Sequence, residues 1–319
     1  MKTVFMGSAE FALPALKTLY ESQNINIDLT ITQPPRKSGR DQKLRQTPVG
    51  KEAEKLGLKI FTPEEINSDE SVEYLKKIEP EYLVVAAFGQ ILQTQVLDIP
   101  KLAPVNLHAS LLPKYRGASP IQHAIINGEK KSGVTTIYMD EGLDSGDILK
   151  QSAVKIEKND TAGSLHDKLA EKGADLLLQT LQEFSAGSIE PQPQDEEKAT
   201  YTPPLKSEDG EVNFASEADK IVDFIRGFNP WPGAFTYFRG ERLKLWSAAS
   251  VNADEKGKPG KIIYADQNNG FQVGTAGDDN VKIKSLQLAG SRRMEAADFI
   301  NGYQPEKGEL LGEKDPAGG

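Results

Sequence analysis

The sequence has no cysteine, and this absence removes several kinds of chemistry at once. Disulfide bonds, thiolate-ligated zinc, iron–sulfur clusters and a cysteine nucleophile are all excluded. Histidine is scarce as well, because the chain holds only His108, His123 and His166, each in a different kind of segment. A multi-histidine metal site would need nearly all of them. We therefore predict that the protein uses no metal ion.

Long apolar runs are also missing. No stretch approaches the ~18 consecutive apolar residues of a membrane-spanning helix, and the N-terminal MKTVFMGSAEF soon reaches a charge at Glu10. The sequence therefore predicts a cytoplasmic protein with no membrane partner.

Two nucleotide-binding motifs are absent as well. The sequence contains no G-x-x-x-x-G-K-[ST], and no G-x-G-x-x-G follows the first predicted strand, which argues against a nucleotide triphosphate or dinucleotide ligand.

Positive charge is in short supply: 38 Lys and Arg stand against 47 Asp and Glu, a net charge of −9. Taken alone, this argues against a nucleic-acid partner, because phosphate binding needs a positive surface. Residues 36–45 (RKSGRDQKLR) depart from that balance, with five basic side chains and one acid, and they follow a predicted strand. We expect this loop to contact phosphate rather than to be only a solvated tether. Its basic residues are Arg36, Lys37, Arg40, Lys43 and Arg45.

The first half of the chain alternates short apolar runs with helical patterns. The run at 82–87 (YLVVAA) is typical of a strand buried on both faces. Alternation of this kind predicts an α/β fold: a doubly wound, mostly parallel, Rossmann-like sheet with helices on both faces. Further strands are expected at 3–6, 27–32, 59–62, 105–111, 134–139 and 148–156, and helices at 48–56, 68–78, 119–127 and 161–184.

Composition changes after the last of these helices. Residues 188–206, rich in Pro, Gln and acidic side chains, are expected to form an extended linker that is not packed. One helix and about five short strands follow, which favours a small closed β-barrel of the OB type, a fold that commonly binds oligonucleotides. The predicted division is therefore a catalytic domain over 1–187, the linker over 188–206, an OB-like domain over 207–312 and a tail over 313–319.

The clearest chemical feature is the pair Asn106 and His108. Residues two apart on a strand point to the same side, so an amide and an imidazole are presented together. The carboxyl end of a parallel strand is where ligands bind in such sheets. An acidic, glycine-rich loop at 139–147 also follows a strand, and its Asp144 can reach His108 and hold its protonation state.

Two long motifs carry a resemblance to a known family. Residues 106–117 (NLHASLLPKYRG) and 140–146 (DEGLDSG) resemble the signatures of the 10-formyltetrahydrofolate-dependent formyltransferases. Residues 7–11, 32–36, 119–122 and 225–233 resemble the branch whose members formylate the methionine carried by initiator tRNA, and the likeness spans roughly residues 2–310. Lys114 stands where the family usually has Arg, which leaves the Asn106, His108 and Asp144 set untouched.

The resemblance implies roles for particular residues. Asn106 and His108 would donate to the oxyanion, and Asp144, His108 and a bound water would move protons. The formyl donor 10-formyltetrahydrofolate would lie along Ser110, Leu111, Leu112 and Pro113, with its pterin framed by Phe88, Gln90, Ile91 and Leu92. For Ile91 and Leu92, core packing is an equal alternative.

The basic loop would engage the acceptor stem of the initiator Met-tRNA. We expect a monomer, and a basic stripe on the second domain that would contact tRNA. Its candidate residues are Arg239, Arg242, Lys244, Lys282, Lys284, Arg292 and Arg293.

Two other functions remain open at this point. The first is the same chemistry on a small amine, such as glycinamide ribonucleotide or an amino sugar nucleotide, which would not need the basic loop. The second is a non-catalytic RNA-binding protein with a relic folate domain. The intact set of Asn106, His108 and Asp144 argues against the second alternative.

Overall fold

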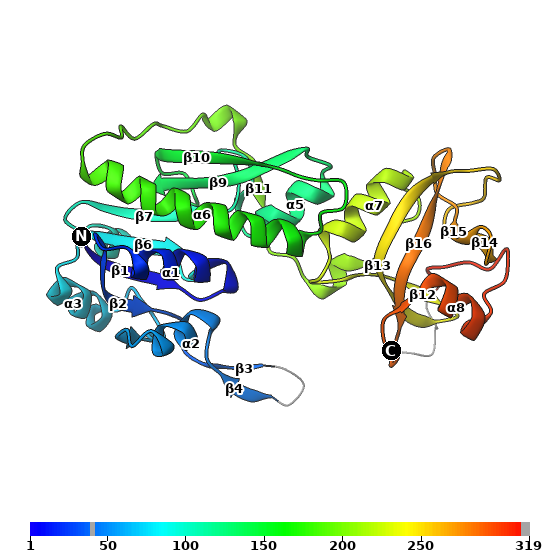
Figure 1. Ribbon diagram of the computed structural model, residues 1–319, viewed down its shortest axis with the longest axis horizontal. Helices are drawn as coiled ribbons and strands as arrows, with labels where there is room; N and C mark the ends of the chain where they lie inside the picture. Colours follow the sequence, from blue (N-terminus) through cyan, green and yellow to red (C-terminus); the bar gives the residue numbers. More distant parts are fainter. Residues whose placement is uncertain (39–41, 314–319) are drawn as a thin grey trace. The chain divides into compact units, whose positions relative to one another are not determined.

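The computed structural model describes residues 1–38 and 42–313. The chain folds into two compact units, which are described separately (Figure 1). Unit 1 comprises Met1–Pro120, Lys131–Lys155 and His166–Thr202, and unit 2 comprises Ile121–Lys130, Ile156–Leu165 and the chain from Pro203 onward. The division predicted from the sequence has consecutive domains and places residues 121–130 and 156–165 in the first one. In the structure, these two segments group with unit 2.

Unit 1 is built on a seven-stranded sheet of order β10-β9-β7-β6-β1-β2-β5. The five strands from β7 to β5 are parallel, whereas β9 runs antiparallel to both β7 and β10. This arrangement agrees with the predicted mostly parallel sheet. The strands are β1 (Lys2–Gly7), β2 (Asn26–Ile31), β5 (Ile60–Phe61), β6 (Tyr82–Ala86), β7 (Ala103–His108), β9 (Lys131–Tyr138) and β10 (Ile148–Lys155).

Helices cover both faces of this sheet because its central strands are apolar on both sides. Every residue of β6 is buried. On one face α6 packs along the strands, with Tyr82 donating to the Leu181 carbonyl, and Figure 1 shows α1 beside it. On the other face Val4 and Met6 join a core with Val72 and Leu75 of α3. The helices are η1 (Glu10–Ala12), α1 (Leu13–Glu21), α2 (Pro48–Lys55), α3 (Asp69–Ile78), α4 (Thr94–Leu97) and α6 (Ala162–Ser185).

Two segments of unit 1 differ from the sequence expectation. The basic loop forms a hairpin of β3 (Arg36–Ser38) and β4 (Lys43–Arg45), which projects from the unit (Figure 1). The expected linker is not unpacked: it contains η2 (Glu196–Lys198) and β11 (Tyr201–Thr202), and β11 pairs with β8 (Arg116–Gly117). Several of its polar side chains have partners elsewhere in unit 1, such as Gln194 and Glu196 on Arg116, which composition alone does not reveal.

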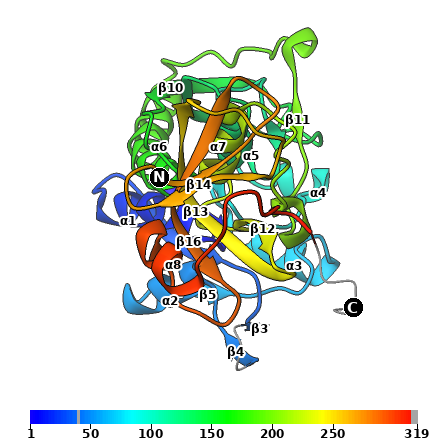
Figure 2. The same cartoon turned by 90° about the vertical axis from the view of Figure 1, so that its right-hand side faces the viewer.

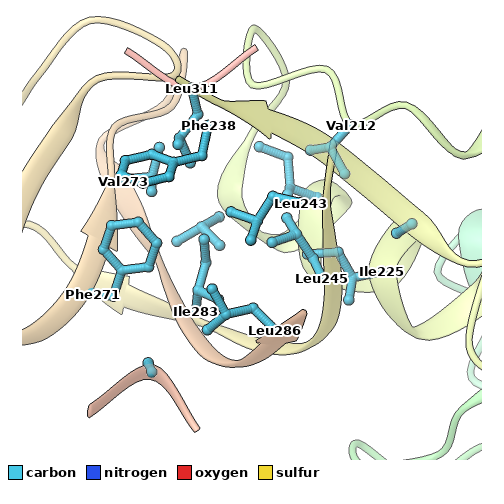
Figure 3. Close-up of a cluster of buried hydrophobic side chains, with 14 of the residues drawn as sticks. Val212, Ile225, Phe238, Leu243, Leu245, Phe271, Val273, Ile283, Leu286 and Leu311 are labelled. Atoms are coloured by element: carbon cyan, nitrogen blue, oxygen red, sulfur yellow. The ribbon is translucent and has the colours of Figure 1, made fainter. Parts of the chain in front are cut away.

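Unit 2 is a strongly curved antiparallel sheet of order β12-β13-β16-β15-β14, with β17 also paired to β16 (Figure 2). Its apolar residues alternate along the strands and meet in one core, drawn in Figure 3. The five main strands fall where the sequence predicted them, in agreement with the OB-like fold. Its elements are α5 (Pro120–Ile126), η3 (Ser207–Gly210), α7 (Ala218–Gly227), β12 (Ala234–Phe238), β13 (Glu241–Asn252), β14 (Ile262–Asp266), β15 (Gly270–Val273), β16 (Asp279–Leu288), β17 (Met294–Glu295) and α8 (Ala296–Tyr303).

Residues 308–312 lie between the two outer strands of that sheet. The Leu311 N–H donates to the Gly260 carbonyl beside β14, and the Gly312 N–H donates to the Tyr237 carbonyl of β12. The Leu311 side chain is buried near Phe238 and Val273 (Figure 3). This segment therefore belongs to the barrel. Among the described residues, no helix is long and apolar enough to cross a membrane.

Candidate active site

The candidate catalytic residues come together at the end of β7. Asn106 Nδ2 donates to Asp144 Oδ1 at 3.2 Å, and His108 Nδ1 lies 3.5 Å from Asp144 Oδ2. The His108 ring is buried, and the Asp144 side chain is only 14% exposed. The sequence therefore identified three residues that meet. Asp144 follows β9, however, and β9 runs antiparallel to β7. The two strands therefore do not end at the same edge of the sheet, and the loop after β9 runs back along β7 to reach Asn106.

Both ring nitrogens of His108 face oxygen atoms. Nε2 lies 2.9 Å from the Tyr115 carbonyl, which can only accept, so Nε2 carries a hydrogen. In the neutral imidazole, Nδ1 then presents a lone pair to the Asp144 carboxylate. A proton between Nδ1 and Oδ2 satisfies both atoms. The His108 ring is therefore held between the Tyr115 carbonyl and the Asp144 carboxylate.

Unusual backbone conformations hold this cluster. Tyr115 and Asp144 both have positive φ, 62° and 54°, a region that side chains other than glycine rarely adopt and that is frequent at functional sites. Gly117 has φ 94°, and its N–H donates to Asp144 Oδ2 at 2.8 Å. A Cβ at Gly117 would lie 2.8 Å from the Thr202 carbonyl oxygen. Only glycine fits there, and its backbone completes the bonding of the carboxylate.

Arg116 is the largest fully buried side chain of the chain's described part, at 1% exposure. Its guanidinium forms a bidentate ion pair with Glu196, at 2.6 and 2.9 Å, and donates to the Tyr201 hydroxyl. Hydrogen bonding to Glu196 raises the pKa of Arg116, and the same bond lowers the pKa of the Glu196 carboxyl. Sequence reasoning missed Arg116, Glu196 and Gln194, because their contact joins segments about eighty residues apart.

The first group of expected folate residues follows β7 directly. Ser110 is buried, and its hydroxyl donates to the Lys114 carbonyl at 2.6 Å. Leu112 is buried, with its N–H donating to Thr135 Oγ1, while Leu111 packs on Gly133 of β9. Pro113 is partly exposed. The carbonyl oxygens of Ser110, Leu112 and Pro113 also accept hydrogen bonds, from Thr135, Gln151 and Thr200, so both the side chains and the backbone of this loop are engaged in holding it.

The second group, after β6, divides between core and surface. Phe88 and Leu92 are buried in the core on the α3 face. Ile91 is 76% exposed, so core packing does not explain this apolar side chain. The Gln90 side chain is bonded to backbone at positions 63 and 66, which holds the loop in place. Of the three apolar side chains in this group, Ile91 is therefore the one that is exposed to solvent.

The described basic residues of the β3–β4 hairpin, Arg36, Lys37, Lys43 and Arg45, are all exposed. Arg40 lies outside the described residues. In unit 2, Lys244 and Arg293 both lie over the ring of Trp246, and Arg242 stacks on Phe235. Arg239 is instead tied to Glu309 at 2.8 Å. Lys282 is partly exposed, and Lys284 and Arg292 are exposed.

Comparison with known proteins places these features in a class. Residues 1–181 match the family model described as formyl transferase, and residues 204–304 match formyl transferase, C-terminal domain. The chain thus carries both domains of one class of formyl-transferring enzymes, the first over residues 1–181 and the second over residues 204–304. No group of three or more potential metal ligands occurs in the part of the chain that the structure describes.

Relatives define the family more narrowly. Methionyl-tRNA formyltransferase of Halothermothrix orenii is 48% identical over 317 residues, covering 98% of this chain and 100% of the relative. The protein of the same name from Bacillus subtilis is 41% identical and covers 98% of each chain. The chain belongs to the methionyl-tRNA formyltransferase family.

Solved structures show the same fold at lower identity. An N-formyltransferase from Helicobacter canadensis, in complex with folinic acid and dTDP-3-aminofucose, has a TM-score of 0.66 at 21% identity, covering 92% of this chain and all of that one. HypX from Aquifex aeolicus, in complex with tetrahydrofolic acid, has a TM-score of 0.61 at 17% identity, covering 98% of this chain and 51% of that one.

Proposed function

We propose that this protein transfers the formyl group of 10-formyltetrahydrofolate to the α-amine of methionine on initiator Met-tRNA. The observation that carries the proposal is the buried cluster of Asn106, His108 and Asp144, in a chain 48% identical to a methionyl-tRNA formyltransferase. The cluster supplies a hydrogen-bond donor and a proton-accepting pair within one small region. Acyl transfer to an amine needs both.

The chemistry starts with the substrate ammonium, which loses a proton to the His108–Asp144 pair. The amine lone pair attacks the formyl carbon, and the carbonyl oxygen takes up negative charge. Asn106 Nδ2 has two N–H groups; one donates to Asp144 and the second remains for the oxyanion. A single well-placed donor of this kind contributes ~3–4 kcal/mol to transition-state stabilisation.

Collapse of the intermediate breaks the bond between the formyl carbon and N10 of the folate. His108 returns its proton to N10, and the former amine nitrogen releases a second proton to solvent. The products are a formamide on methionine and tetrahydrofolate. The exposed basic hairpin and the cations around Trp246 are the surfaces that we assign to the tRNA.

The direct test is incubation with 10-formyltetrahydrofolate and Met-tRNA, with formyl-methionine read by mass spectrometry. We expect rapid formylation of Met-tRNA and background levels with glycinamide ribonucleotide or an amino sugar nucleotide. Formylation of a small amine at a comparable kcat/KM would overturn the assignment of the acceptor. Absence of any formyl transfer, with folate binding retained, would reduce the protein to a binding role.

A further inference from the structure

Residues 192–202, here called the strap, lie along the loops that hold the candidate catalytic residues. At one end, Gln192 exchanges two backbone hydrogen bonds with Ile148, at 2.8 and 2.9 Å. At the other end, β11 pairs with β8, and the Arg116 N–H donates to the Thr200 carbonyl. The strap is thus fixed to unit 1 on both sides of Gln194.

Gln194 uses the whole hydrogen-bonding capacity of its amide. Its Nε2 donates to the carbonyl of Asp144 at 2.8 Å and to that of Gly146 at 2.7 Å. Its Oε1 accepts from Nε and Nη2 of Arg116, at 3.1 and 2.9 Å. A terminal amide offers two donors and two lone pairs, so all four are occupied. This one side chain joins the loop of Asp144 to the loop of Arg116.

Both of these loops hold atoms of the candidate site. Arg116 lies between Tyr115, whose carbonyl accepts from His108 Nε2, and Gly117, whose N–H donates to Asp144 Oδ2. The carbonyl that Gln194 holds on the other loop belongs to Asp144 itself, a residue at φ 54°. A backbone in that sparsely populated region persists only where its surroundings fix it. Gln194 supplies that restraint from a segment outside both motifs.

We propose that Gln194 is a positioning residue for formyl transfer, which sets the mutual placement of His108 and Asp144 by bridging their two loops. This inference rests on the proposed function for its kinetic consequences, although the geometry it describes exists in the free protein. Gln194 bonds neither the His108 ring nor the Asp144 carboxylate. Its effect on them passes through the Asp144 backbone carbonyl and through Arg116. Misplacement of reacting groups by ~1 Å can cost on the order of 10²-fold in rate.

Two substitutions separate the parts of this bridge. Gln194→Met keeps the bulk and removes all four hydrogen bonds. Gln194→Glu keeps an acceptor for Arg116 but turns an oxygen toward two carbonyl oxygens. We expect each to lower kcat by ~10-fold or more, with Glu at least as severe as Met, while KM for both substrates stays within about twofold. The pH profile of kcat should also change, because the His108–Asp144 separation sets how that pair holds its proton.

Two controls distinguish positioning from stability. Tyr201→Phe removes a bond from the strap to Arg116 but none to the Asp144 loop, and should leave kcat within about twofold. Thr180→Val removes the buried hydrogen bonds that the Thr180 hydroxyl of α6 makes with Thr136 of β9 and with the Leu176 carbonyl, and it serves as the control for reduced stability. If Thr180→Val lowered kcat as much as Gln194→Met at the same decrease in Tm, or if Gln194→Met changed only KM, the proposal would be wrong.

A second measurement does not depend on turnover. The chain has only three histidines, so their ring-nitrogen NMR signals can be assigned with His123→Gln and His166→Gln. In the free protein, Gln194→Met should shift the His108 ring signals and leave those of His123 and His166 in place. Unchanged His108 signals would overturn the positioning role even if the natural acceptor were not Met-tRNA. Failure of the wild-type protein to formylate Met-tRNA would instead count against the proposed function.

Discussion

Two loops of unit 1 follow strands of the same sheet and are built in opposite ways. The loop of Asp144 is fixed by Gly117, Asn106 and Gln194, and the Asp144 side chain is mostly buried. The hairpin at 36–45 is exposed at each of its described basic residues. The first loop has its dipoles arranged before any substrate arrives, and the second presents charge to solvent.

The difference matches two physical tasks. Stabilising charge that develops in a transition state requires groups that do not reorganise during the reaction. Binding a polyanion requires exposed cations that displace counterions, and the resulting affinity depends on salt. The comparison therefore predicts that changes in the first loop act on turnover and changes in the hairpin act on tRNA affinity.

The largest expected effect comes from the cluster itself. Asn106→Ala, His108→Ala and Asp144→Ala should each lower kcat by ~10²-fold or more, because each removes an interaction that acts in the transition state. Affinity for tRNA, measured by filter binding, should change little. Near-normal turnover of His108→Ala would show that the centre lies elsewhere.

The next effect tests how rigidly the first loop is held. Gly117→Ala forces a side chain into φ 94° and brings its Cβ within 2.8 Å of the Thr202 carbonyl, so we expect ~10-fold lower kcat as the Gly117 N–H moves. Gly187→Ala is the matched control, because its φ is 68° and nothing lies within 4 Å of the added Cβ. It should lower Tm by strain alone and keep full turnover. Equal kcat for the two variants would contradict a tightly held loop.

A smaller effect is expected from the hairpin. Replacing Arg36, Lys37, Lys43 or Arg45 singly with Gln should lower the slope of log K against log salt by roughly one unit for each phosphate that is no longer neutralised. Turnover at saturating tRNA should be unchanged. Arg40→Gln belongs in the same series, and Lys77→Gln, an exposed lysine of α3, is the control. A hairpin variant with an unaltered salt slope would identify a side chain that touches no phosphate.

The smallest effect concerns acid. Hydrogen bonding to Arg116 lowers the pKa of Glu196 from its ordinary value of 4.5, so this bond stabilises the folded state above pH 4.5 and its contribution disappears as pH falls through the lower, folded-state value. Glu196→Gln should therefore be less stable than the wild type near neutral pH, and the difference should shrink below pH 4.5. Urea unfolding across pH 3–7 measures this. A difference that is constant with pH would assign the effect to packing instead of charge.

The sequence predicted two of the residues that contact Asp144 in the first loop, because their placement follows from the period of a single strand. Asn106 and His108 share a strand face through the two-residue period, and continuous apolar runs mark the buried strands. The bond from Gln194 to Asp144 joins residues 50 positions apart, and no local pattern encodes it. The strap has the composition of a solvated linker, and only its hydrogen bonds show that it is packed.

Two other features lay beyond the sequence patterns for similar reasons. The hairpin at 36–45 has no alternation of apolar and polar residues, so charge was its only signal. Residues 308–312 contain a single large buried side chain, Leu311, and their bonds are made by backbone atoms. Backbone pairing of this kind is indifferent to side-chain identity, so the sequence placed this stretch in the second domain without indicating that it joins the two outer strands.

The placement of residues 308–312 has a consequence for the protein during its synthesis. Unit 1 has all its segments once Thr202 has left the ribosome, whereas the outer strands β12 and β14 wait for the last stretch of the barrel to emerge. Unpaired strand edges are templates for pairing with other chains. At ~5–20 residues added per second, the nascent barrel passes through an interval of seconds with those edges uncovered. During that interval, the edges of β12 and β14 are where we expect unit 2 to pair with other chains.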